Sequence, residues 1–121
     1  MIRVAPSENV VVPQGQTTLV NFNCIANGTN VLWIINGTLV HHEAQSRYQE
    51  SGITFYPDSF VPSGINISIG INVTTARNNN TELSCFVSHY DRSTQVTRNS
   101  TSPAITLTIA GILYSQKMIL F

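Results

Sequence analysis

Charged residues are scarce in this chain of 121 residues. They make up 10% of it, with six Lys and Arg against six Asp and Glu, whereas about 25% is usual for globular proteins. Phosphate binding needs clustered cations and the sequence has no basic run, so we expect neither nucleic acid nor an anionic membrane surface as a partner. The polar surface must come from Asn, Ser and Thr instead. The length suits one domain with a single hydrophobic core.

Catalytic motifs and metal-ligand patterns are missing as well. The sequence contains no Gly-x-Ser-x-Gly elbow, His-Glu-x-x-His helix or phosphate loop. His41, His42 and Glu43 are consecutive, and on a strand only His41 and Glu43 share a face, which gives two ligands where about three are needed. We therefore expect no enzyme, no metal site and no cofactor.

Neither end of the chain shows a clear targeting or membrane segment. Met1 to Ser7 has no apolar stretch followed by a cleavage site, which indicates a fragment or a mature form. Residues 105–121 are mostly apolar, but Tyr114 to Lys117 interrupt them, and about 17 residues fall short of the usual span of about 20. We expect residues 1–110 to form the domain. Residues 111–121 would be a disordered tail, a truncated membrane segment through which the chain could be anchored, or a wrongly translated end.

The sugar-acceptor pattern Asn-x-Ser/Thr is frequent. It occurs at Asn27, Asn36, Asn66, Asn72, Asn79 and Asn99, where chance predicts roughly two or three matches. Asn and Thr are also common in turns, so any single match has that alternative explanation. Together the six indicate N-glycosylation and the secretory pathway, and hence an extracellular or cell-surface location.

The two cysteines agree with an oxidising compartment. Cys24 and Cys85 each lie on an alternating, strand-like segment, and they are the only cysteines of the chain. Secretion would pair them, and closing a loop of roughly 60 residues stabilises a fold by about 4 kcal/mol. Two reduced thiols in the core are the alternative.

Alternation of apolar and polar residues predicts strands along most of the chain. The clearest inward-facing sets, each listed with a spacing of two, are Val20, Phe22 and Cys24; Val31, Trp33 and Ile35; Ile65, Ile67, Ile69, Ile71 and Val73; Leu83, Cys85 and Val87; and Ile105, Leu107 and Ile109. Asn36-Gly37 predicts a hairpin turn with a return strand at Leu39–His42, and Ile53–Tyr56 is a further short strand. Many short strands separated by turns indicate an all-β sandwich of two antiparallel sheets.

The segment Pro13-Gln14-Gly15 before the strand that ends in Cys24, together with Trp33 and Cys85, resembles the immunoglobulin superfamily over residues 9 to 109. The resemblance implies one immunoglobulin-like domain with Greek-key connections, in which Cys24 and Cys85 join the two sheets and Trp33 packs on the bridge. Leu83 replaces the usual corner tyrosine and Asn79 a common aspartate, so a variable and an intermediate type both stay open.

Alternation also assigns the outward faces of the two sheets. Asn66 and Asn72 lie opposite the isoleucines, so glycans there would cover one sheet. On the other sheet Leu32, Ile34 and Phe86 point outward and predict an association surface, which sugars on Asn36 and Asn99 would narrow. Alternatively, residues 44 to 64 cover these three side chains, or they are scattered singly.

The segment from Ser88 to Ser102 is expected to be a loop that joins the last two strands. It contains His89, Tyr90, Asp91 and Arg92, residue types that suit recognition. The resemblance matches it to the loop that contacts antigen in variable domains. A solvated loop without a partner is the alternative.

These observations predict an extracellular immunoglobulin-like recognition or adhesion module of a cell-surface receptor of immune type. It would bind a protein ligand or a second immunoglobulin-like domain. A secreted structural spacer and a lectin-like, carbohydrate-binding sandwich are the alternatives. A spacer predicts that Leu32, Ile34 and Phe86 are covered within the monomer, whereas a receptor predicts that they are exposed in one patch.

Overall fold

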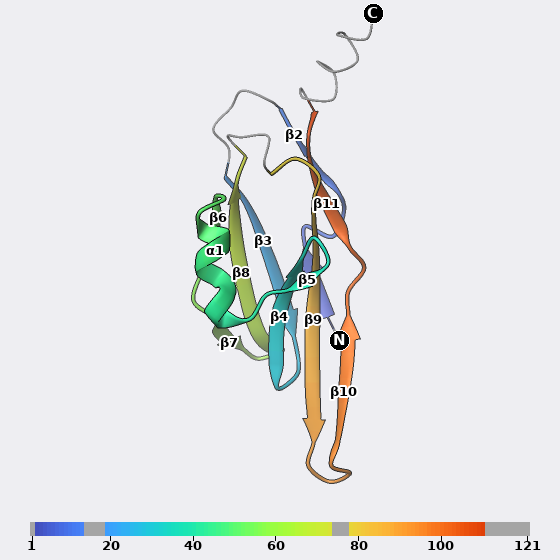
Figure 1. The fold of residues 1–121 in the computed structure, drawn as a ribbon. Helices are drawn as coiled ribbons and strands as arrows, with labels where there is room; N and C mark the ends of the chain where they lie inside the picture. Colours follow the sequence, from blue (N-terminus) through green and yellow to red (C-terminus); the bar gives the residue numbers. More distant parts are fainter. Residues whose placement is uncertain (1, 14–18, 74–77, 111–121) are drawn as a thin grey trace, which may run out of the picture.

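The computed structural model describes residues 2–13, 19–73 and 78–110, and these form two β-sheets packed face to face (Figure 1). The five-stranded sheet has the order β1 (Ile2–Ala5), β3 (Leu19–Ala26), β8 (Gly64–Asn72) and β6 (Ile53–Phe55), and β7 (Ser59–Val61) also pairs with β8. The six-stranded sheet has the order β2 (Val10–Val12), β11 (Ile105–Ile109), β9 (Thr81–Asp91), β4 (Asn30–Ile35) and β5 (Thr38–Leu39), and β10 (Val96–Thr101) also pairs with β9.

This arrangement confirms the predicted all-β, immunoglobulin-like sandwich with Greek-key connections. β3 and β4 follow one another along the chain but lie in different sheets, and β3 pairs instead with the distant β8. The expectation of purely antiparallel sheets needs one correction, because β2 and β11 pair in parallel. The N-terminal segment thus supplies an edge strand to each sheet, β1 to the five-stranded sheet and β2 to the six-stranded sheet. The predicted tail at residues 111–121 and most of the predicted turn after Pro13 lie outside the described residues.

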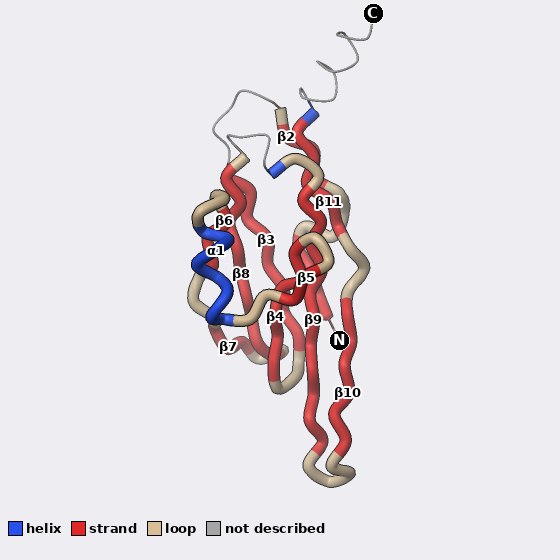
Figure 2. The backbone as a smooth tube through the Cα atoms, viewed as in Figure 1, coloured by secondary structure: helices blue, strands red, loops and turns tan. Residues whose placement is uncertain are grey.

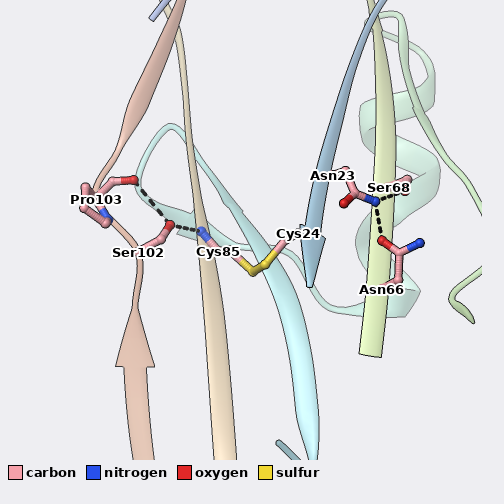
Figure 3. Close-up of a disulfide and its surroundings, with 7 residues drawn as sticks. All are labelled: Asn23, Cys24, Asn66, Ser68, Cys85, Ser102 and Pro103. Atoms are coloured by element: carbon pink, nitrogen blue, oxygen red, sulfur yellow. Dashed lines mark hydrogen bonds between the residues drawn. A yellow bond between two sulfur atoms is a disulfide. The ribbon is translucent and has the colours of Figure 1, made fainter. Parts of the chain in front are cut away.

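The core lies between the sheets and contains most of the side chains that alternation assigned to it, with Val20 and Ile65 only half-buried at its border. Ile67, Ile69 and Ile71 of β8 are buried, and Leu83 fills the place of the missing corner tyrosine with no exposed surface. The Cys24–Cys85 disulfide joins β3 to β9, with the two Cα atoms 6.4 Å apart (Figure 3). Trp33 is paired with Cys85 across β4 and β9 and is 3% exposed, so the indole lies beside the bridge as the resemblance implied.

The segment after the Asn36-Gly37 turn differs from its prediction. The return strand is only Thr38–Leu39, and the chain then forms the short 3-10 helix η1 (His42–Ala44) and the helix α1 (Gln45–Gln49). Val40 comes directly after this strand, with its side chain buried and its N–H donating to the carbonyl of Trp33 (2.9 Å). The helix packs against β6 through an edge-to-face contact of Tyr48 and Phe55, with ring centroids 6.2 Å apart.

The predicted loop from Ser88 to Ser102 is also wrong, because these residues form a β-hairpin. β9 continues to Asp91 and β10 begins at Val96, so only four residues form the turn. The Asp91 carboxylate accepts hydrogen bonds from the backbone N–H and the hydroxyl of Ser93 (2.9 and 2.7 Å), and Gln95 has a positive φ of 57°. The hairpin extends beyond the body of the sandwich (Figure 2).

A β-bulge separates β10 from β11. Thr101 is paired with Phe86 and Ile105 with Leu83, so the two β9 residues between them face the three residues Ser102 to Ala104. An extra residue inverts the side-chain alternation. As a result, Thr101 points outward with Phe86, whereas Ile105 points into the core with Leu83. Ser102 stabilises the bulge, because its N–H donates to the Cys85 carbonyl (2.9 Å). Its hydroxyl also accepts from the Cys85 N–H (2.8 Å) (Figure 3).

Candidate protein-binding face

The outer face of the six-stranded sheet carries the three predicted contact residues. Leu32 is paired with Phe86 across β4 and β9, and Ile34 follows on the same face opposite Ser84. All three apolar side chains are half-buried, so they are neither covered by the rest of the monomer nor fully exposed. They form one continuous apolar strip along β4 and β9 rather than scattered positions.

A groove of about 620 Å³ opens beside this strip. Leu32 and Phe86 lie in it, whereas Ile34 does not border it. Besides β4 and β9, the groove is lined by β5 with Leu39; by His41 and the start of η1 with His42 and Glu43; by β7 with Phe60, preceded by Asp58; by β8 with Ile65; and by β10 with Thr97 and Asn99. The segment 44 to 64 thus borders the apolar strip and does not close over it.

Phe60 is the feature of this groove that the sequence analysis missed. Its side chain is 86% exposed, more than any other large apolar side chain of the described chain. It lies on β7 opposite Ile65. The sequence signal was present, because a phenylalanine between Pro57 and Pro62 has no alternating neighbours that would carry it into a core.

The four predicted hairpin residues are divided between two faces. Tyr90 lies on the same face as Phe86 and is 44% exposed, opposite Thr97. His89 lies on the other face, opposite Arg98, and both border a second, shallow pocket of about 420 Å³.

Asp91 and Arg92 lie at the tip of the hairpin. Hydrogen bonds from the hydroxyl and the N–H of Ser93 lower the pKa of Asp91 below its ordinary value of 3.8. The Asp91 carboxylate therefore holds the turn together, while Arg92 is exposed.

The six acceptor asparagines have different surroundings. Asn27 and Asn36 are exposed at turns, and the carbonyl oxygen of the Asn36 side chain accepts from the N–H of Glu82 (2.9 Å). Asn99 is exposed on β10 and borders the groove. Asn79 is half-buried and accepts from the N–H of Ile109 (2.8 Å), so it ties the start of β9 to β11. Asn72 is half-buried at the end of β8.

Asn66 belongs to a ladder of polar side chains on the outer face of the five-stranded sheet. The amide of Asn23 donates to Asn66 and to the hydroxyl of Ser68 (2.9 Å) (Figure 3). The amide nitrogen of Asn66 in turn donates to the hydroxyl of Ser59 (3.1 Å). The nitrogen that would carry a sugar is thus engaged in the folded domain. This face is polar and uncharged along the ladder, in contrast to the apolar strip of the other sheet.

Within residues 2–13, 19–73 and 78–110, no three His, Cys, Asp or Glu side chains come together as a metal site. No helix in the same ranges is long and apolar enough to cross a membrane.

The fold and the inter-sheet disulfide define an immunoglobulin-like β-sandwich with an open, partly apolar face. No protein-family model matches the chain. No curated protein matches it either.

Proposed function

We propose that this chain is a member of the immunoglobulin superfamily that acts as an extracellular recognition or adhesion module of a cell-surface receptor. It binds a protein partner non-catalytically, through the outer face of the six-stranded sheet. The observation that carries the proposal is the groove in which Leu32 and Phe86 are accessible beside the exposed ring of Phe60.

The composition of the face supports a protein partner. Aromatic side chains are enriched in protein interfaces, and charged residues are depleted at their centres. Phe86 and Leu32 form the centre here, Tyr90 continues it along β9, and Glu43 and Asp58 are at the rim. The groove is lined by no Lys or Arg among the described residues. A complementary partner would therefore insert an apolar side chain and place a cation near the rim.

The location rests on two features of the chain. The Cys24–Cys85 disulfide links the two sheets, and disulfides persist in oxidising compartments such as the cell exterior. Six acceptor sequences for N-linked sugar support the same compartment.

The test compares two exposed apolar side chains. Tetramers of the labelled domain are applied to intact cells, and binding is measured for the wild type, Phe60→Ser and Val11→Ser. Phe60 borders the groove, whereas Val11, 64% exposed on β2, is the matched control outside it. Neither change should affect folding, because both side chains are largely in solvent.

We expect Phe60→Ser to lower binding by about tenfold or more, as truncation of an aromatic anchor does, and Val11→Ser to leave it unchanged. Protease treatment of the cells should abolish binding, and glycosidase treatment should not. If Phe60→Ser binds as well as Val11→Ser and the wild type, the groove is not the binding site. Binding sensitive only to glycosidase would identify a lectin-like module, and no binding by the wild type would favour a structural spacer.

A further inference from the structure

β10 is the longest edge strand among the described strands. It has six residues, all exposed, and it pairs with β9 on one side only. The other edge strands, β1, β2, β5, β6 and β7, have between two and four residues. Edge strands are commonly protected by Lys, Pro, bulges or shortness. β10 contains no Lys or Pro, its one charged residue is Arg98, and the bulge and Pro103 come only after it ends.

The hydrogen bonds of β9 show which backbone groups of β10 are free. The Ser88 carbonyl accepts from Thr29 and the Tyr90 N–H donates to the Thr29 hydroxyl, so even-numbered residues of β9 point toward β4. The Cys85 carbonyl accepts from Ser102, so odd-numbered residues point toward β10. In an antiparallel strand the N–H and C=O of one residue point to the same side.

The register then assigns each residue of β10 to a side. Arg98 and Ser100 are paired with the odd-numbered His89 and Val87, so their backbone groups bond to β9. The remaining alternate residues, Thr97, Asn99 and Thr101, direct both backbone groups toward the open edge. Their side chains lie on the outer face of the sheet, since their partners are Tyr90, Ser88 and Phe86.

We propose that a second copy of this chain binds to this edge, β10 to β10, in an antiparallel arrangement about a two-fold axis. A two-fold axis perpendicular to the sheet pairs residues that share a face. If the axis passes at Asn99, Asn99 faces its symmetry mate and Thr97 faces Thr101. Every outward N–H and C=O of the three residues then finds a partner. An axis at Arg98 leaves Thr101 unpaired and places two guanidinium groups opposite each other, which is unfavourable.

Two further observations favour a second copy over a foreign strand. The axis at Asn99 places Thr97 of one copy against Thr101 of the other, and Thr–Thr pairs across strands are favourable. The formal net charge of the chain is zero, so two copies do not repel each other through net charge. Because Thr101 neighbours Phe86, the dimer would also join the two candidate binding faces into one surface. The inference does not depend on the proposed function, since it uses the backbone of β10 and not the groove.

Cysteine substitutions test the register. In protein produced without N-linked sugar, Asn99→Cys places two thiols on directly opposed residues whose Cα atoms are about 5.5 Å apart, which is within the range of a disulfide. Thr97→Cys is the matched control, equally exposed on the same face. Its symmetry mate is four residues further along, at about 13 Å, too far for a bond. We expect the first variant to form a covalent dimer under mild oxidation and the second to stay uncrosslinked.

Proline and alanine at the same position test the edge. Asn99→Pro removes an outward N–H and puts a ring on the edge without removing a bond to β9, whereas Asn99→Ala keeps the N–H. Sedimentation velocity over a concentration series should show that the wild type and Asn99→Ala dimerise. The association constant of Asn99→Pro should be lower than theirs by at least about tenfold. A monomeric wild type would overturn the proposal. Equal crosslinking of the two cysteine variants, or unchanged association of Asn99→Pro with intact circular dichroism, would do so too.

Discussion

Ser102 offers a direct test of how the bulge holds the last two strands. Its hydroxyl is the acceptor for the N–H of Cys85, a residue with no exposed surface. Ser102→Ala removes this acceptor and the longer, exposed hydrogen bond from the hydroxyl to the Pro103 carbonyl (3.3 Å), whereas the N–H of residue 102 can still donate to the Cys85 carbonyl. The Cys85 N–H is then buried without a partner.

The cost follows from that geometry. Leaving a buried donor unsatisfied costs about 1–3 kcal/mol, more than the net value of an ordinary hydrogen bond. We take about 2 kcal/mol, which for a domain of this size corresponds to a fall in Tm of about 8 °C. Ser102→Thr is the matched control, since it keeps a hydroxyl at the same place and should retain most of the stability.

Equilibrium denaturation in guanidinium chloride, with calorimetry for Tm, measures both variants against the wild type under oxidising conditions. The m-value should stay unchanged, because the surface exposed on unfolding is the same. A loss of less than about 0.5 kcal/mol for Ser102→Ala would show that the Cys85 N–H has another partner. An equal loss for Ser102→Ala and Ser102→Thr would show that the fit of the side chain matters and the hydroxyl does not.

Three other substitutions probe separate features. Gly64→Ala should destabilise the domain by about 3 kcal/mol in denaturant titrations, because Gly64 has a φ of 138° and a Cβ there would approach a backbone carbonyl of β3 to 2.3 Å; a neutral result would contradict the turn geometry. Replacing Cys24 and Cys85 by Ala should lower the free energy of unfolding by about 4 kcal/mol, since their separation of 61 residues sets the loop entropy, and an unchanged midpoint would refute that estimate. Asp91 should titrate below 3.8 by NMR, because its folded pKa is lowered; its contribution to stability is therefore complete above 3.8 and is lost as pH falls through the folded pKa. Ser93→Ala should move the midpoint up toward 3.8, and an unmoved midpoint would assign the shift to another group.

The parts of the fold that could be predicted from sequence are those whose side chains alternate between core and solvent. β8 is the clearest case, because Ile67, Ile69 and Ile71 face the core while their neighbours form the polar ladder. The pairing of Cys24 with Cys85 followed from their being the only cysteines of a chain expected to be secreted, and the place of Trp33 beside the bridge followed from the resemblance; the structure confirms both.

β10 could not be predicted, and the reason is physical. All six of its residues are exposed, so neither face contacts the core and no apolar residue recurs at every second position. A strand held by backbone hydrogen bonds alone has no hydrophobic periodicity to detect. α1 was not predicted for a related reason, since a helix of five residues without a buried side chain is too short to show a helical hydrophobic periodicity.

On the candidate face, too, the residues that follow from alternation were predicted and those that depend on contacts distant in sequence were not. Leu32, Ile34 and Phe86 were placed on one face by counting from Trp33 and Cys85, and the register confirms that placement. Phe60 was not found, because its nearness to Leu32 depends on how β7 folds back onto β8, which involves contacts distant in sequence. His89 and Tyr90 lie on opposite faces, because neighbours on a strand point to opposite sides.

The covalent link between the sheets also limits how far the molecule can lengthen when it is pulled by its ends. An extended chain is about 3.4 Å long per residue. The disulfide, with its separation of 61 residues, therefore reduces the length to which the chain can be stretched by about 200 Å. That is about half of the 121 residues. Under tension only the flanking segments could extend, and reducing the bridge would release the other half as a separate, measurable step in length.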